Sequence, residues 1–144
     1  MRRLRSEVEI DASPEEVWKT FADFRSFPTW NPFIRQAKGK LVPGKRLKIK
    51  LQLGRRVVKF RPKVTFVNEP LELRWRARQW IPGLFDVDRR FKIEPVGDSR
   101  SRFVQSESGS GLLSPFLMPL MRRRILRGYE AFNGAIKARV ERRS

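Results

Sequence analysis

The chain has 144 residues, of which 40% are hydrophobic, and these include eleven Phe and four Trp. This composition excludes a disordered chain and supplies enough apolar material for one domain spanning residues 1–144. The sequence contains no Cys and no His, which removes disulfides and disfavours zinc chemistry and triad hydrolysis. We therefore expect no metal and no cofactor. The net charge of +18 favours anionic partners such as nucleic acid, lipid headgroups or acidic proteins.

The N-terminal segment does not have the pattern of a signal peptide. Met1–Arg5 is basic, but Ser6–Glu9 follows it where a signal peptide has an apolar run. The longest apolar block, Leu112–Met121, is too short to cross a bilayer and contains two prolines. We expect a cytoplasmic protein, with peripheral contact to the inner face of the membrane as an alternative.

The first third of the chain predicts one strand followed by two short helices. Arg3–Ile10 alternates charged and apolar residues, as a strand with one buried face does. Ser13 is a good helix N-cap, Pro14 suits the first helical position, and Glu16 completes a capping box. The segment Phe24–Phe33 contains two prolines and predicts a short broken helix with a turn.

A period of two then dominates the sequence and predicts antiparallel strands. Turn signals at Pro43-Gly44, Leu53-Gly54, Glu69-Pro70, Pro82-Gly83 and Gly97-Asp98 separate or flank these strands. Pro62, inside one of them, indicates an edge position or a bulge that helps the sheet to curve. The predicted strands are Leu47–Leu53, Val58–Phe66, Leu71–Ala77, Phe85–Glu94 and Ser101–Glu107.

The C-terminal segment predicts a long amphipathic helix that begins near Ser114 and Pro115. Its apolar stripe contains Met121, Ile125, Phe132, Ile136 and Val140. Such a stripe has to pack on a large apolar surface, and the concave face of the sheet is the main candidate. The predicted fold is α+β of the helix-grip type, with a curved antiparallel sheet of about six to seven strands wrapped on the long helix.

Several segments are similar to blocks of the START-like or SRPBCC superfamily. Ala12–Trp18 resembles its opening ASPEEVW signature, and Phe27–Phe33 resembles its YPEWNPF segment. Leu73–Arg76, Gly83–Phe85 and Phe91–Pro95 are similar to later blocks of polyketide cyclase/dehydrase-like members. The resemblance implies a helix-grip fold like that of birch-pollen-allergen-like proteins, whose interior carries lipids, hormones or polyketides.

Two departures from the superfamily concern chemistry. Related sequences often have histidines on the last two strands, where this chain has Arg89 and Gln105. They also often have an aromatic residue where this chain has Gly109, and its loss is expected to widen the mouth of a cavity.

Strand alternation places three polar residues, Arg89, Gln105 and Glu107, on the inner face of the sheet. In one interpretation Arg89 and Glu107 form an ion pair with a structural role only. In the other, the three residues orient the carboxylate, hydroxyl or carbonyl of a ligand. The remaining candidates for ligand contact are Trp30, Asn31, Trp75, Phe60, Phe91, Phe103, Tyr129 and Phe132, although the aromatic residues among them can equally fill the interior. Asn31 can instead cap its own turn.

These residues favour binding of a small hydrophobic ligand, neutral or anionic, over catalysis. Glu107, desolvated in an apolar pocket, is the single weak candidate for a general base in a cyclase/dehydratase-type enzyme. Paired carboxylates, phosphate loops and metal-ligand spacings are absent from the sequence.

A third hypothesis is a cationic protein that binds membrane surfaces. The candidate contacts are the apolar Leu113, Phe116 and Leu117, and the cationic Arg122, Arg123 and Arg124. These residues can equally roof the cavity. Nucleic acid is disfavoured as a partner, because the aromatic residues on the strands face away from the basic ones.

Overall fold

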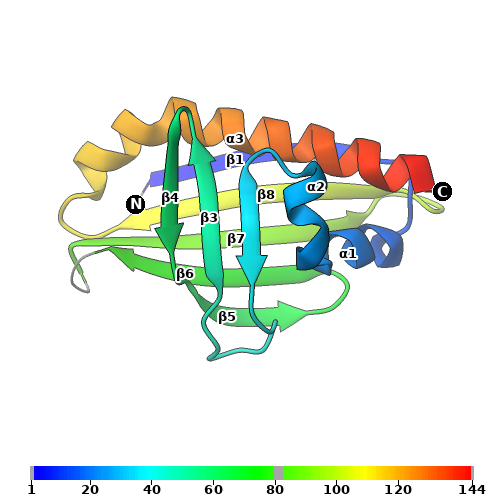
Figure 1. Cartoon of the computed structure of the whole chain (residues 1–144), viewed down its shortest axis with the longest axis horizontal. Helices are drawn as coiled ribbons and strands as arrows, with labels where there is room; N and C mark the ends of the chain where they lie inside the picture. Colours follow the sequence, from blue (N-terminus) through cyan, green and yellow to red (C-terminus); the bar gives the residue numbers. More distant parts are fainter. Residues whose placement is uncertain (1, 80–82, 144) are drawn as a thin grey trace.

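The computed structural model describes residues 2–79 and 83–143 and contains two antiparallel sheets and a long C-terminal helix (Figure 1). A short 3₁₀ turn, Phe24–Ser26, separates the first two helices. In chain order the elements are β1 (Arg2–Ile10), α1 (Pro14–Ala22), α2 (Phe27–Trp30), β2 (Ile34–Lys38), β3 (Lys48–Leu53), β4 (Arg56–Phe60), β5 (Lys63–Asn68), β6 (Glu72–Gln79), β7 (Phe85–Pro95), β8 (Ser101–Ser110) and α3 (Ser114–Arg143).

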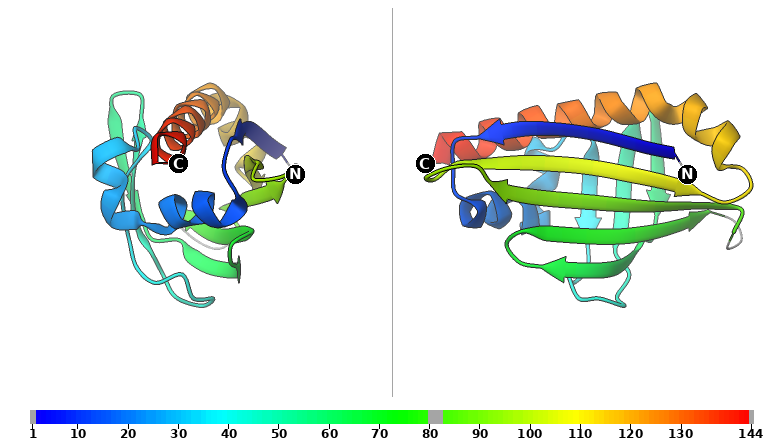
Figure 2. Two further views of the ribbon diagram at one scale, coloured as in Figure 1. Left: turned by 90° about the vertical axis from the view of Figure 1, so that its right-hand side faces the viewer. Right: turned by 180° about the vertical axis from the view of Figure 1, so that it is seen from behind.

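The larger sheet has the order β1-β8-β7-β6-β5, and the smaller sheet has the order β2-β3-β4. The strands of the smaller sheet cross those of the larger one, and α3 runs along the open side between them (Figure 1). An end-on view shows the two sheets and α3 curling around a common interior (Figure 2). This arrangement is the START-like helix grip that the sequence predicts.

Local sequence signals explain where the first helix begins. The Ser13 hydroxyl accepts a hydrogen bond from the Glu16 backbone N–H at 3.3 Å, and Pro14 is the first helical residue. The apolar face of α1 buries Val17, Trp18 and Phe21. The helix therefore closes one end of the grip, and the predicted N-cap is confirmed.

The predicted strand Val58–Phe66 is wrong, because Pro62 divides it between the two sheets. β4 ends at Phe60 and β5 begins at Lys63, and these are edge strands of different sheets. Proline has no N–H for a ladder, so the chain changes direction at this point. A hydrogen bond links this crossing to the β2–β3 loop, since the Leu47 N–H donates to the Pro62 carbonyl at 2.9 Å.

Two other differences concern the extent of the strands. β2 was not predicted, since its residues alternate poorly, and with it the described residues form eight strands rather than six to seven. β8 continues to Ser110, three residues beyond the predicted end at Glu107. The predicted turn at Pro82-Gly83 falls partly on residue 82, outside the described residues.

The apolar stripe of α3 packs on the concave face of the large sheet, as predicted. Phe132, Ile136 and Val140 are almost fully buried. Phe132 belongs to a cluster of aromatic rings with centroid separations of 4.9–6.5 Å, whose other members are Phe21, Phe91 and Phe103. This cluster fills the interior at the end nearest α1, so any cavity has to lie at the opposite end.

Candidate functional site

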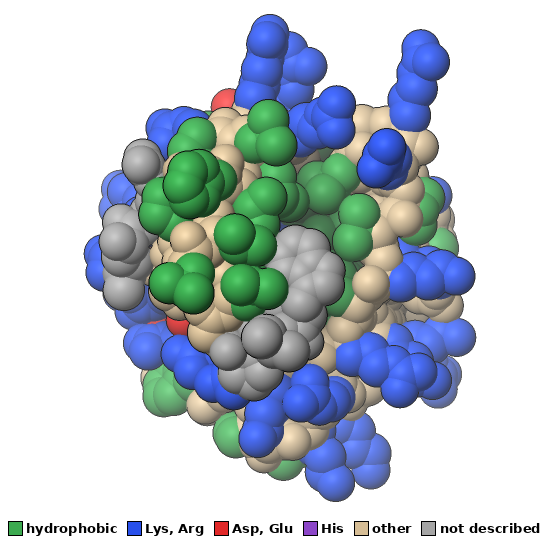
Figure 3. Space-filling model, turned by 90° about the vertical axis from the view of Figure 1, so that its left-hand side faces the viewer, with side chains coloured by type: hydrophobic (Ala, Val, Ile, Leu, Met, Phe, Trp, Pro, Cys, Tyr) green, Lys and Arg blue, Asp and Glu red, His purple; other side chains and the backbone are tan. Residues whose placement is uncertain are grey.

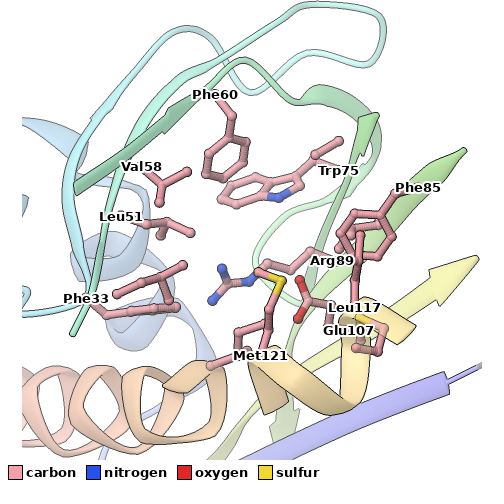
Figure 4. A pocket seen from close by; sticks show the side chains of 15 residues that line it. Phe33, Leu51, Val58, Phe60, Trp75, Phe85, Arg89, Glu107, Leu117 and Met121 are labelled. Atoms are coloured by element: carbon pink, nitrogen blue, oxygen red, sulfur yellow. The ribbon is translucent and has the colours of Figure 1, made fainter. Parts of the chain in front are cut away.

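A pocket of about 290 Å³ lies at the other end of the grip, between the small sheet, the large sheet and the first turns of α3 (Figure 4). Its wall is almost entirely apolar, apart from one arginine and one glutamate. The lining residues are Phe33, Leu51, Leu53, Val58, Phe60, Trp75, Ala77, Phe85, Val87, Arg89, Glu107, Leu117, Met118, Met121 and Ile125. A small concave apolar site with few polar groups is typical of ligand binding.

Strand register brings the two polar residues together. Trp75 on β6 pairs with Arg89 on β7, and Arg89 pairs in turn with Glu107 on β8. Because paired residues on adjacent antiparallel strands point to the same face, all three side chains are directed inward. In Figure 4 the Arg89 guanidinium and the Glu107 carboxylate both project into the pocket.

The Arg89 side chain is buried, with 3% of its surface exposed, and aromatic rings surround it. Its Cζ lies 4.6 Å from the centroid of the Tyr129 ring and 4.8 Å from that of Phe91. The rings of Phe33 and Trp75 follow at 5.1 Å and 5.7 Å. Cation–π attraction to these rings compensates part of the desolvation of the guanidinium.

The expected Arg89–Glu107 ion pair is absent among the residues that the structure describes. Arg89 Nη2 instead donates to Gln105 Oε1 at 2.7 Å, and Arg89 Nε is buried without a hydrogen-bond partner. The neutral amide lies within reach on the same inner face of the sheet, so Arg89 receives a hydrogen bond acceptor without a countercharge. The Glu107 carboxylate acts on Arg89 only from beyond ion-pair distance. Among the described residues no carboxylate therefore pairs directly with the guanidinium, and a buried cation in this situation attracts a further anion.

Gln105 is part of a buried polar network rather than the pocket wall. Its Nε2 donates to Asn133 Oδ1 at 2.8 Å, and Asn133 Nδ2 donates to Ser6 Oγ at 3.0 Å. The network links β8, α3 and β1. It holds the amide oxygen of Gln105 against Arg89 and so fixes the guanidinium.

Glu107 and Tyr129 complete the polar end of the site. Burial raises the pKa of Glu107, while the positive charge of Arg89 and the Tyr129 hydroxyl lower it in part. Burial also raises the pKa of Tyr129 well above its ordinary value. Glu107 Oε2 and the Tyr129 hydroxyl are both buried without a hydrogen bond of ordinary geometry. The two groups interact with each other, and neither atom has a further partner among the described residues.

The structure divides the candidates from the sequence into pocket residues and core residues. The candidates that line the pocket are Phe60, Trp75, Arg89, Glu107 and Leu117. The others, predicted as ligand contacts but absent from its wall, are Trp30, Asn31, Phe91, Phe103, Gln105, Tyr129 and Phe132. Most of these side chains are buried in the aromatic cluster or the polar network.

Asn31 caps its own turn, which is the second of the two roles that the sequence allowed. Its Oδ1 accepts from the backbone N–H groups of Phe33 at 3.0 Å and Ile34 at 2.9 Å. The side chain thereby satisfies two buried donors at the start of β2. Trp30 is also held locally, since its Nε1 donates to Ser26 Oγ at 2.8 Å. Local hydrogen bonds thus hold both side chains outside the pocket wall.

Some pocket residues were missed as candidates. Leu51 and Val58 could have been identified from the sequence, since both alternate with basic residues on predicted strands. Phe33 could not, because it follows a proline turn outside any periodic segment. The widening expected at Gly109 does not occur, because the Met118 side chain fills that space, 2.6 Å from the position of a Cβ atom.

The fold and the pocket together define a helix-grip protein with an apolar internal pocket. Over residues 1–141 the chain matches the family model described as polyketide cyclase / dehydrase and lipid transport, and it belongs to that family. No curated protein sequence matches it significantly.

Solved structures with the same fold have distant sequences. A START superfamily protein from Mycobacterium smegmatis is 21% identical with a TM-score of 0.77, and 99% of each chain is covered. The Zhui aromatase/cyclase from Streptomyces sp. R1128 is 13% identical with a TM-score of 0.78, over 99% of this chain and 94% of that one. Norcoclaurine synthase from Thalictrum flavum is 15% identical with a TM-score of 0.73, over 99% and 96%. At these identities the similarity shows the fold alone.

Two observations concern metals and membranes. Within residues 2–79 and 83–143, no three acidic side chains come together as a metal site requires. No helix in the described part of the chain is long and apolar enough to cross a membrane.

Proposed function

We propose that the protein binds a small hydrophobic molecule with an acidic or strongly polar end. The observation that carries this proposal is the buried guanidinium of Arg89, which projects into an apolar pocket with an unpartnered Nε. The apolar wall supplies affinity, and Arg89 supplies orientation.

The electrostatics of the pocket favour an anionic group. A buried charge is unfavourable, and the aromatic rings, the Gln105 amide and the more distant Glu107 carboxylate compensate it only in part. A ligand carboxylate within hydrogen-bond distance of Arg89 would form the direct ion pair that Glu107 does not form. Glu107 lies on the paired position of the neighbouring strand and repels the same carboxylate when ionised. Its raised pKa reduces that repulsion.

The size of the pocket limits the ligand. A volume of about 290 Å³ is at the lower end of ligand sites, which span about 300–1,000 Å³. We infer a compact aromatic acid or a short acyl chain rather than a two-chain lipid.

A second function, a cyclase- or dehydratase-type reaction, is favoured by one specific observation. Glu107 lines the pocket with the buried Tyr129 hydroxyl beside it, and the raised pKa of Glu107 suits a general base. In this proposal Glu107 accepts a proton from a bound substrate while Arg89 stabilises the negative charge that develops. A Glu107→Gln variant that keeps ligand affinity but loses turnover would support it, whereas unchanged turnover would exclude Glu107 as the base.

The binding function is tested by filling the pocket. Val58 lines the pocket, whereas the adjacent Val57 is 53% exposed, so Val58→Trp and Val57→Trp form a matched pair on one strand. The neutral fluorescent probe N-phenyl-1-naphthylamine reports occupation of an apolar site. We expect Val57→Trp to bind the probe as the wild type does and Val58→Trp to lose binding.

Native mass spectrometry of the protein from its own host then identifies what co-purifies with the wild type. We expect a small organic acid that is absent from the Val58→Trp variant. Probe binding that is equal in both variants would show that the probe does not enter this pocket and would refute the assignment.

A further inference from the structure

An exposed apolar patch surrounds the start of α3. Among the described residues six large hydrophobic side chains are exposed, and the three most exposed lie within nine residues of one another. These are Leu112 at 78%, Phe116 at 73% and Leu120 at 78%. Phe116 and Leu120 are four residues apart and share one face of the helix. We call these three residues the apolar patch.

The backbone holds the apolar patch in place. Leu112 N–H donates to the Gly83 carbonyl at 3.1 Å, and Leu113 N–H donates to the Leu84 carbonyl at 2.9 Å. At Gly111 a Cβ atom would lie 2.7 Å from the Leu84 carbonyl oxygen, so only glycine allows this approach. The patch is therefore presented by a segment fixed to the large sheet.

The apolar patch borders the ligand pocket. Leu117 and Met121 lie on the same turns of α3 as the patch, but on the face that lines the pocket. Figure 3 shows the hydrophobic side chains gathered on this end of the molecule beside a hollow, with Lys and Arg side chains around them.

Cationic side chains surround the patch. Arg122, Arg123 and Arg124 follow it directly on α3 and are exposed. Arg55 and Arg56 are exposed at the tip of the β3–β4 hairpin, and Arg124 lies against that tip, with its Nε 4.0 Å from the position of a Cβ atom on Gly54. None of these five arginines forms an ion pair within the described part of the chain. Asp86 at the same end is already 4.0 Å from Arg78.

We propose that this end of the protein docks on an anionic lipid bilayer, with Leu112, Phe116 and Leu120 inserted among the acyl chains and the arginines on the headgroups. The pocket mouth then faces the membrane. Protruding apolar side chains inside a cationic ring match the layered chemistry of a negatively charged membrane surface.

Charge argues against the other partners of such a patch. A second copy of the chain would bring the same arginines face to face across a symmetric interface, and like charges repel. Nucleic acid would satisfy the arginines but would leave the apolar side chains in contact with water. An anionic bilayer offers headgroups to the arginines and acyl chains to the apolar side chains.

The test is co-sedimentation of the full chain with vesicles of phosphatidylcholine alone and of phosphatidylcholine with phosphatidylserine. We expect binding to the mixed vesicles only, weakened by salt. Because all three patch side chains are exposed, Phe116→Ser/Leu120→Ser is expected to fold normally and to bind at least about tenfold more weakly. Val42→Ser, at an exposed site on the β2–β3 loop, is the apolar control and is expected to bind as the wild type does.

A charge-matched pair separates local docking from general attraction. Changing Arg122, Arg123 and Arg124 to Gln removes three charges at the patch. Changing Lys38, Lys40 and Lys45 to Gln removes three charges in and beside the β2–β3 loop, at the end of the small sheet away from the β3–β4 hairpin (Figure 1). At physiological salt we expect only the first set to reduce binding, because charges beyond a Debye length are screened.

Equal losses in both sets would overturn the proposal, as would absence of binding to the mixed vesicles at low salt. Self-association that Phe116→Ser/Leu120→Ser abolishes, without vesicle binding, would assign the patch to a second copy and also overturn it. Pocket occupation is measured separately with N-phenyl-1-naphthylamine, so failure of docking leaves the ligand proposal intact.

Discussion

Gly128 on α3 should be one of the least replaceable residues near the pocket. A Cβ atom at this position would lie 2.2 Å from Phe33 Cε1 and 2.3 Å from Phe33 Cδ1, well inside van der Waals contact. Phe33 is almost fully buried and cannot swing away freely. Gly134, six residues further along the same helix, has no atom within 4 Å of its Cβ position. Gly128→Ala and Gly134→Ala are therefore a matched pair.

Both substitutions gain about 1 kcal/mol of helix propensity. At Gly134 this gain is the whole effect, and the variant should be more stable than the wild type. At Gly128 the overlap with the Phe33 ring costs about 1–3 kcal/mol, as overpacking in cores does. The gain cancels in the comparison, so the difference between the two free energies of unfolding, about 1–3 kcal/mol, measures the overlap alone.

Urea unfolding of the two variants at one pH measures this difference. Because Phe33 lines the pocket and lies against Arg89, Gly128→Ala should also change probe affinity, whereas Gly134→Ala should not. Equal stabilisation by both substitutions would show that α3 does not approach Phe33 at these distances and would contradict the predicted overlap.

Three further variants test the polar groups by urea unfolding. Burial raises the pKa of Glu107 in the native state above its ordinary 4.5, so wild-type stability falls as pH rises from 4.5 through the native pKa. Glu107→Gln should thus be more stable than the wild type at neutral pH, with the advantage vanishing towards pH 4.5; a constant difference would contradict the shift. Gln105→Leu should destabilise by about 3 kcal/mol, because Arg89 loses an acceptor and Asn133 loses a donor, and a neutral result would contradict the network. Asn31→Ala should cost about 2 kcal/mol or more, since two buried N–H groups lose their acceptor, and a cost near zero would argue against the cap.

The inner face of β7 and β8 was predictable because strand periodicity is a local signal. Arg89, Gln105 and Glu107 were expected on that face, and all three point inward. The N-cap at Ser13 and the buried stripe of α3 were predictable for the same reason, since each depends on neighbours in sequence.

The partners of those inward residues were not predictable. Whether Arg89 pairs with Glu107 or with Gln105 depends on side-chain conformations and on Asn133, which lies on a helix distant in sequence. The position of the cavity depends on which rings stack on Phe132, and alternation cannot rank one inward phenylalanine above another. Pro62 was noticed, but its effect, the passage between two sheets, depends on how both sheets curve.

We propose that Arg89 gives the apolar pocket its preference for an anionic ligand. The pair 1-anilinonaphthalene-8-sulfonate and N-phenyl-1-naphthylamine tests it directly, because the two probes differ by one sulfonate. We measure both dissociation constants by fluorescence for the wild type, for Arg89→Met, and for Arg90→Met, whose residue lies on the outer face of the same strand and pairs with Glu72. We expect the wild type and Arg90→Met to prefer the sulfonate. Arg89→Met should lose this preference by about 2 kcal/mol while keeping its affinity for the neutral probe. An unchanged preference for the sulfonate in Arg89→Met would show that Arg89 does not select an anionic ligand.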